Sequence, residues 1–133
     1  MALPLAAGRI LPRLRHVGLC VSRAGSRPRA QELNMAHLTA LEVSRRMKSV
    51  PGWARRSRVV RRKFIFVGFV EAIDFVNRVS RVAERANHHP DIDIRWNKVT
   101  LALTTHSEGG LTGKDFQAAR EYSRIFTRYF VPG

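Results

Sequence analysis

All 11 aromatic side chains of this 133-residue chain lie after Met35. Aromatic residues supply much of the area that a hydrophobic core buries, so a folded unit needs the segment that holds them. Residues 1–34 contain six Arg and one Glu, whereas residues 35–133 contain 18 basic and nine acidic residues. The second segment is long enough for one domain with a modest core. We therefore expect a leader at residues 1–34 and a single domain at residues 35–133.

The leader has the composition of a mitochondrial transit peptide, because residues 1–31 contain arginine and no acidic side chain. Its arginines interrupt the apolar residues, which argues against a secretory signal and a membrane span. We expect import into the mitochondrial matrix. The alternative is translation from Met35, which would leave the protein in the cytoplasm. The single cysteine, Cys20, lies in the leader, so residues 35–133 have no internal disulfide and no cysteine metal ligand.

Two helices are predicted in the first half of the domain. Thr39 begins a capping-box spacing, which indicates a short helix over residues 39–49. From Phe69 onward, apolar residues recur every three or four positions, as on one side of a long helix. This helix should end near residues 87–89, because Pro90 cannot continue it and restricts the residue before it.

Four strands are predicted around these helices. Residues 53–56 and 59–66 are rich in β-branched and aromatic side chains and indicate a hairpin. Apolar and polar residues alternate over residues 92–96 and 99–105, which indicates a second hairpin. Asn97 lies at its corner, and asparagine tolerates the left-handed conformation that tight turns require.

A last helix completes the pattern. Thr112 and Asp115 have the spacing of a helix start, and aromatic residues follow along one side. The side chain of Trp96 is expected to pack in the core at the second hairpin. The order α-β-β-α-β-β-α favours an α+β domain of two layers, in which a four-stranded antiparallel sheet carries helices on one face.

Three histidines are candidates for proton transfer. His88 and His89 follow the long helix and His106 follows the fourth strand, so these ends could meet. Imidazole titrates near pH ~6.5 and exchanges protons at neutral pH. Glu84 and Asp115 are the carboxylates that could orient the rings. A histidine in the last helical turn can instead simply cap carbonyl groups. A metal site is not expected, because the sequence lacks an H-E-x-x-H motif.

The chain resembles the pterin-4a-carbinolamine dehydratases in three segments, which read ERANHHPDIDIRWNKV at 84–99, LALTTH at 101–106 and GLTGKD at 110–115. Weaker similarity extends over residues 37–130. The resemblance implies dehydration of a 4a-hydroxytetrahydropterin to quinonoid dihydropterin and water, which recycles a tetrahydrobiopterin-type cofactor after aromatic amino acid hydroxylation. It implies no cofactor and no metal, because the pterin is itself the substrate.

The resemblance also implies roles for individual residues. His88 and His106 would exchange protons at the 4a-hydroxyl, and His89 would bind the ring. Glu84 and Asp115 would support the imidazoles. The implied substrate-binding residues are Asn87, His88, His89, Thr104, Thr105, His106 and Ser107.

Six cations lie within residues 55–63. In a regular strand they divide between two faces, which favours a solvated edge that resists aggregation over a phosphate-binding surface. The two predicted groups are Arg56, Arg58 and Arg62, and Arg55, Arg61 and Lys63. We therefore expect neither a nucleic-acid nor a membrane partner. The alternative is an organellar RNA-binding protein, motivated by the charge of +9 in residues 35–133.

Self-association is expected, as a homodimer or homotetramer. The resemblance implies self-association, and an unpaired sheet edge with an aromatic final helix would suit such an interface.

The resemblance also implies an aromatic amino acid hydroxylase as the partner in the pathway. A second alternative is a non-catalytic protein of the same fold. The family is also known for acting as a dimerisation cofactor of a homeodomain transcription factor.

Overall fold

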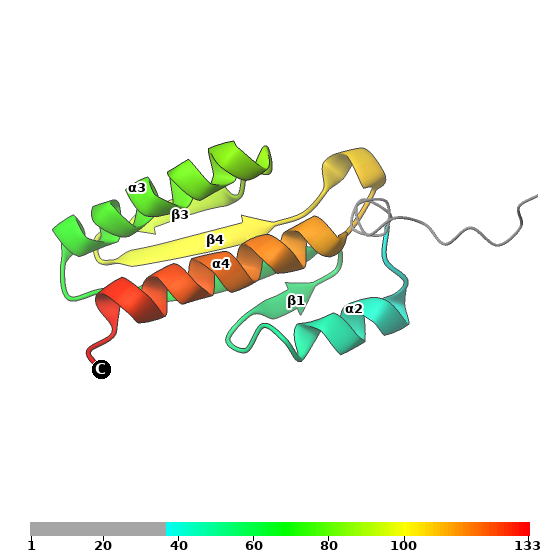
Figure 1. Ribbon diagram of the computed structural model, residues 1–133, viewed down its shortest axis with the longest axis horizontal. Helices are drawn as coiled ribbons and strands as arrows, with labels where there is room; N and C mark the ends of the chain where they lie inside the picture. Colours follow the sequence, from blue (N-terminus) through cyan, green and yellow to red (C-terminus); the bar gives the residue numbers. More distant parts are fainter. Residues whose placement is uncertain (1–36) are drawn as a thin grey trace, which may run out of the picture.

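The computed structural model describes residues 37–133 (Figure 1). The predicted leader at residues 1–34 and the domain start at residue 35 lie outside the described residues. Within residues 37–133, no helix is both long and apolar enough to span a bilayer. The elements are α2 (Ala40–Met47), β1 (Ala54–Arg56), β2 (Val59–Ile65), α3 (Phe69–Ala86), β3 (Asp91–Arg95), β4 (Lys98–Leu103), a 3₁₀ turn at His106–Glu108 and α4 (Gly113–Phe130). The predicted order of helices and strands is confirmed.

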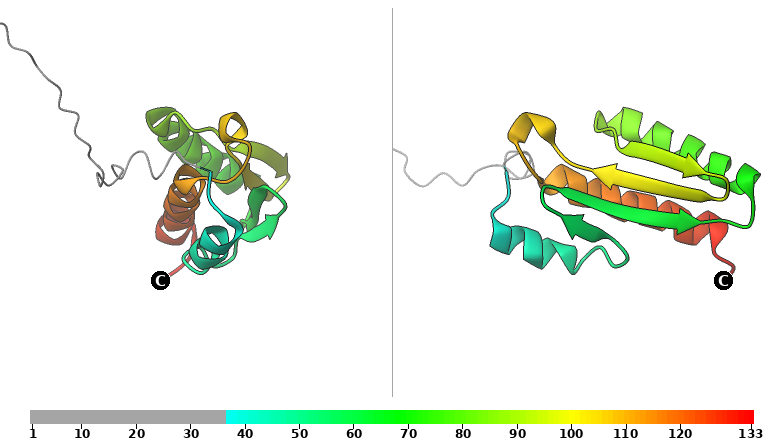
Figure 2. Two further views of the ribbon diagram at one scale, coloured as in Figure 1. Left: turned by 90° about the vertical axis from the view of Figure 1, so that its right-hand side faces the viewer. Right: turned by 180° about the vertical axis from the view of Figure 1, so that it is seen from behind.

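The four strands form one antiparallel sheet in the order β1-β2-β4-β3. The helices α3 and α4 pack against one face of this sheet, and α2 lies beside β1 (Figures 1 and 2). The other face is not covered by any of the described elements (Figure 2, right). The predicted two-layer α+β fold is therefore confirmed.

Both predicted helix starts carry a complete capping box. The Thr39 hydroxyl accepts a hydrogen bond from the Glu42 backbone, and the Glu42 carboxylate accepts one from the Thr39 backbone at 2.8 Å. Thr112 and Asp115 repeat this arrangement at the start of α4. Such caps satisfy backbone N–H groups that have no partner within the helix. The helix α3 ends at Ala86, and its C-cap residue Asn87 adopts the left-handed conformation (φ 48°).

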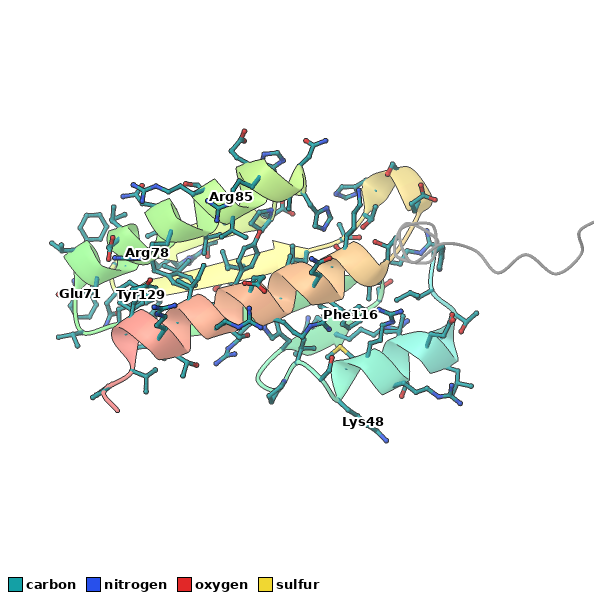
Figure 3. The ribbon with its side chains drawn as sticks, in the orientation of Figure 1. Lys48, Glu71, Arg78, Arg85, Phe116 and Tyr129 are labelled. Atoms are coloured by element: carbon teal, nitrogen blue, oxygen red, sulfur yellow. The ribbon has the colours of Figure 1, made fainter. Side chains whose placement is uncertain are left out.

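The core lies between the sheet and the two long helices. Phe64 of β2 contacts Phe75 of α3 and Phe126 of α4, with ring centroids 4.8 and 5.1 Å apart. Rings at such distances add to the stabilisation that burial provides. Near the C-terminal end of α4, the Tyr129 ring contacts α3, with its centroid 4.0 Å from the Arg78 guanidinium (Figure 3). These contacts fix α3 and α4 relative to each other, and thus the ends of both helices.

The second hairpin turns where predicted, but Trp96 and Asn97 exchange their expected roles. Asn97 was expected to adopt the left-handed conformation, and Trp96 was expected to be buried. Trp96 takes the positive φ (53°) and its side chain is 67% exposed. Asn97 is buried, and its amide donates a hydrogen bond to the Phe66 carbonyl at 2.8 Å. The prediction that Trp96 packs in the core is wrong, because the turn points its side chain outward while Asn97 anchors the hairpin.

The predicted division of the basic segment is also wrong. A turn at Ser57 (φ 53°) separates β1 from β2 and pairs Arg56 with Val59. Paired residues project to the same face, so Arg56 shares the uncovered face with Arg61 and Lys63. Arg62 lies on the helix face, with its guanidinium 4.7 Å from the Phe64 ring centroid. The predicted division of the cations assumed one regular strand over residues 55–63, although the same residues were expected to form a hairpin, and it missed the change of face at the turn.

Candidate functional site

His88 and Asp115 form a buried pair between the ends of two helices. The distance from His88 Nε2 to Asp115 Oδ1 is 2.7 Å, and the side chains are 10% and 0% exposed. The left-handed turn at Asn87 lets the His88 backbone donate to the Ala83 carbonyl at 3.1 Å, which fixes where the histidine leaves α3. Asp115 lies in the first turn of α4. Both partners are thus positioned by helix ends.

The Asp115 carboxylate is held by two further hydrogen bonds besides the contact with His88. Its Oδ2 atom accepts hydrogen bonds from the Thr105 hydroxyl at 2.8 Å and from the Thr112 backbone at 2.9 Å. The two threonine hydroxyls lie 3.0 Å apart. An ionised carboxylate only accepts hydrogen bonds, so Nε2 of His88 must carry a proton. The other ring nitrogen, Nδ1, is then the one that can exchange a proton with a ligand.

His89 and Glu84 form a second pair, with 2.6 Å between Nε2 and Oε1. Their side chains are 57% and 76% exposed. Water competes for both partners in such a pair, so it contributes little to stability. The pair can still orient the imidazole toward a ligand.

His106 reaches this region through the loop that precedes α4. It begins the 3₁₀ turn and is exposed, and it makes no hydrogen bond to another side chain of residues 37–133. The loop is closed by backbone hydrogen bonds between Thr105 and Gly110. Because Thr105 also bonds to Asp115, His106 is adjacent in sequence to a residue that shares the carboxylate of His88. The loop residues Thr104 and Ser107 make no side-chain hydrogen bond to the described residues.

A pocket of about 430 Å³ borders His88 between α3 and α4. Its wall consists of Val82, Arg85, Ala86, His88, Lys114, Gln117, Ala118, Glu121 and Tyr122. Arg85 lies near the C-terminal end of α3 (Figure 3). Of the residues predicted from the sequence, His88 alone is in this wall. The residues on the α4 side of the pocket were not predicted, although spacings of three and four from Lys114 place them on one helical face.

Tyr122 borders the pocket with a buried hydroxyl that finds no hydrogen-bond partner within residues 37–133. Burial raises the pKa of this hydroxyl to about 12. The phenol is therefore neutral at physiological pH and is not an acid–base group there. Within the same residues, no cluster of three or more His, Cys, Asp or Glu side chains could hold a metal ion.

Comparisons with known proteins identify the family. Residues 36–125 match the family model of pterin 4 alpha carbinolamine dehydratase. A Roseiflexus castenholzii protein, provisionally named pterin-4-alpha-carbinolamine dehydratase, is 49% identical over 90 residues, covering 68% of this chain and 97% of the relative. A Mycolicibacterium smegmatis protein with the same name is 47% identical over 93 residues, covering 70% of this chain and 99% of the relative.

A solved structure agrees with this assignment. The crystal structure of a transcriptional coactivator/pterin dehydratase from Brucella Melitensis superposes with a TM-score of 0.65 at 32% identity. The superposition covers 67% of this chain and 97% of that one. The chain belongs to the pterin 4 alpha carbinolamine dehydratase family.

Proposed function

We propose that this protein converts a 4a-hydroxytetrahydropterin to quinonoid dihydropterin and water by histidine acid–base catalysis. The observation that best supports this proposal is the buried pair of His88 and Asp115, which leaves one imidazole nitrogen for a substrate. Membership of the dehydratase family and the dehydratase-named relatives support the same activity.

The reaction is an elimination that needs two proton transfers. The bond from C4a to the hydroxyl oxygen breaks, and the oxygen leaves with the electron pair and takes up a proton to form water. The adjacent ring nitrogen loses its proton, and the electrons of that bond form the new double bond to C4a. Each well-positioned proton transfer contributes about 10²- to 10⁴-fold in rate.

The environment of each histidine suggests its role. His88 acts at the 4a-hydroxyl as a catalytic residue, and Asp115 is a positioning residue that also stabilises the imidazolium. His106 is the second acid–base residue, because its exposed ring can exchange protons with water. His89 binds the pterin ring and is positioned by Glu84. Asn87, Thr104, Thr105 and Ser107 surround the three imidazoles in sequence and complete the binding site.

The test is dehydration of enzymatically generated 4a-hydroxytetrahydropterin, followed by ultraviolet absorbance. The protein should accelerate the reaction above its spontaneous rate. His88→Ala and His106→Ala should each lose this acceleration. If folded wild-type protein gives no acceleration, the proposed activity is wrong.

A non-catalytic role is the second candidate, and the name of the Brucella Melitensis relative includes transcriptional coactivator. Such a role depends on a protein partner, as would a complex with an aromatic amino acid hydroxylase. A partner complex that survives His88→Ala and His106→Ala unchanged, with no dehydration by the wild type, would favour it.

A further inference from the structure

The uncovered face of the sheet is strongly basic. Each of the four strands contributes at least one cation to it, and we call these five residues the basic face: Arg56, Arg61, Lys63, Arg95 and Lys98. From behind, the strands lie in front of the helices, and no described element covers this face (Figure 2, right). The arrangement depends on the β1–β2 turn, which brings Arg56 to the side of Arg61 and Lys63.

The strand register places these cations close together. Lys63 lies opposite Thr100 on β4, and Thr100 lies opposite Asp93 on β3. Arg95 lies opposite Lys98 at the end of the same hairpin. Directly opposed residues have Cβ atoms roughly 5 Å apart. The face therefore presents several positive charges within reach of one ligand.

These charges are mostly not balanced within the described chain. Two carboxylates share the face, Asp91 and Asp93, and only Asp93 forms an ion pair, with Arg95 at 3.0 Å. Arg61, Lys63 and Lys98 pair with no carboxylate of residues 37–133. A surface that leaves like charges side by side is suited to a polyanion, because binding then removes their repulsion.

Protection of the sheet edges does not explain the positions of these cations. Basic residues on edge strands prevent strands of different molecules from pairing. The edge strands are β1 and β3, whereas Arg61, Lys63 and Lys98 lie on the central strands β2 and β4. The backbones of Arg61 and Lys98 are paired with a strand on both sides, whereas Lys63 is paired with β4 alone. Arg61 and Lys98 therefore need another explanation.

Two further features favour single-stranded nucleic acid over other polyanions. The face is hollowed by about 530 Å³ beside Arg61, Lys63 and Lys98. Trp96 is not part of the wall of this hollow, but it lies between Arg95 and Lys98 in the chain, in the turn that joins β3 to β4, and the residue is 67% exposed. Exposed aromatic rings beside a basic groove stack on unpaired bases while the cations hold the phosphates. An acidic peptide or a lipid headgroup has no base to place there.

The position of Asp93 favours RNA over DNA as the ligand. Its carboxylate lines the hollow and repels phosphate, but it can accept a hydrogen bond from a ribose 2′-hydroxyl. Deoxyribose lacks this donor. We propose that the basic face, together with Trp96, binds single-stranded RNA through its phosphates, one stacked base and a 2′-hydroxyl.

The experiment is fluorescence anisotropy of the full chain with a labelled oligo-uridine of about 15 nucleotides, titrated between about 50 and 200 mM salt. Binding should weaken steeply with salt. The triple variant Arg61→Ala, Lys63→Ala and Lys98→Ala should bind at least about tenfold more weakly at low salt. Its logarithmic salt slope should fall by about 2, because three phosphate contacts are lost.

A matched control removes the same charge elsewhere. Arg45, Lys48 and Arg81 are exposed cations on or beside α2 and α3, and replacing all three with alanine should change the affinity less than about twofold. Trp96→Ala should weaken binding about tenfold with little change in the salt slope, because stacking does not release counterions. Pterin dehydration should be unchanged in the basic-face triple variant, which also shows that it is folded.

Four outcomes would overturn the proposal. These are no binding by the wild type at low salt, equal losses in the two triple variants, equal or tighter binding of an oligo-deoxythymidine of the same length, and displacement of the RNA by oligo-glutamate or anionic vesicles at equal charge. None of these outcomes bears on the dehydratase activity, so the two proposals are tested separately.

Discussion

Two histidine–carboxylate pairs flank the end of α3, and they differ in burial rather than in distance. His88 and Asp115 lie 2.7 Å apart with side chains that are 10% and 0% exposed. His89 and Glu84 lie 2.6 Å apart with side chains that are 57% and 76% exposed. A buried charge without its partner is strongly destabilising, whereas water replaces a partner at the surface. Loss of one partner should therefore destabilise the protein much more at the buried pair than at the exposed pair.

The largest expected effect is on catalysis at the buried pair. His88→Ala should reduce kcat/KM for pterin dehydration by about 10²- to 10⁴-fold, because an acid–base group that touches the reacting oxygen is lost. His89→Ala should act mainly on KM, because this ring binds substrate in the proposed mechanism. Steady-state kinetics of both variants measure the difference. If both lose kcat equally, the distinction between the two histidines is wrong.

The next effect is on stability at the same pair. Asp115→Asn should lower the free energy of unfolding by about 3 kcal/mol, because the negative charge is lost and the amide NH₂ must face another donor, either the Thr112 N–H or the imidazole N–H. Urea denaturation measures the change. Asp74→Asn is the matched control, since Asp74 forms its ion pair with Arg78 at the surface. A loss as small as that of the control would show that burial of Asp115 has little effect on stability.

A third comparison concerns Tyr122, which is buried without a hydrogen-bond partner in the described residues. Its folded pKa of about 12 lies above the ordinary value of 10.0. The neutral phenol is therefore favoured by folding. The stabilisation that comes from this raised pKa is fully present below pH ~10, and it is lost as the pH rises toward about 12.

Tyr122→Phe tests this point. The variant should unfold with nearly unchanged free energy at pH 7, because a polar group without a partner is replaced by an apolar ring of similar shape. Its stability should fall less than that of the wild type between pH ~10 and ~12. Urea unfolding across this range compares the two proteins. A large loss at pH 7 would indicate that the hydroxyl has a partner after all.

The smallest effect is expected at the exposed pair. Glu84→Gln should change the free energy of unfolding by less than about 0.5 kcal/mol, because both partners of this ion pair are hydrated. The matched control is Glu71→Gln on the same helix. Substrate KM should rise only in the Glu84 variant, since Glu84 positions His89. A destabilisation close to that of Asp115→Asn would contradict the comparison between the two pairs.

Local patterns predicted most of the secondary structure. Capping boxes at Thr39 and Thr112 marked helix starts, and Pro90 marked the region where α3 ends. These signals work because the interactions behind them join residues only a few positions apart. Turn residues were harder to predict. The positive φ at Trp96 and the change of face at Ser57 depend on how the hairpins pack, so both side-chain placements were wrong.

By itself, the sequence determined the order of the elements, the family signature and the candidate histidines, because periodicity, caps and motif spacing are properties of neighbouring residues. Tertiary structure alone decided that the His88 ring pairs with Asp115 in a buried site and that cations from four strands share one face. Burial and strand register arise from contacts between segments far apart in the chain, and a linear pattern does not contain them.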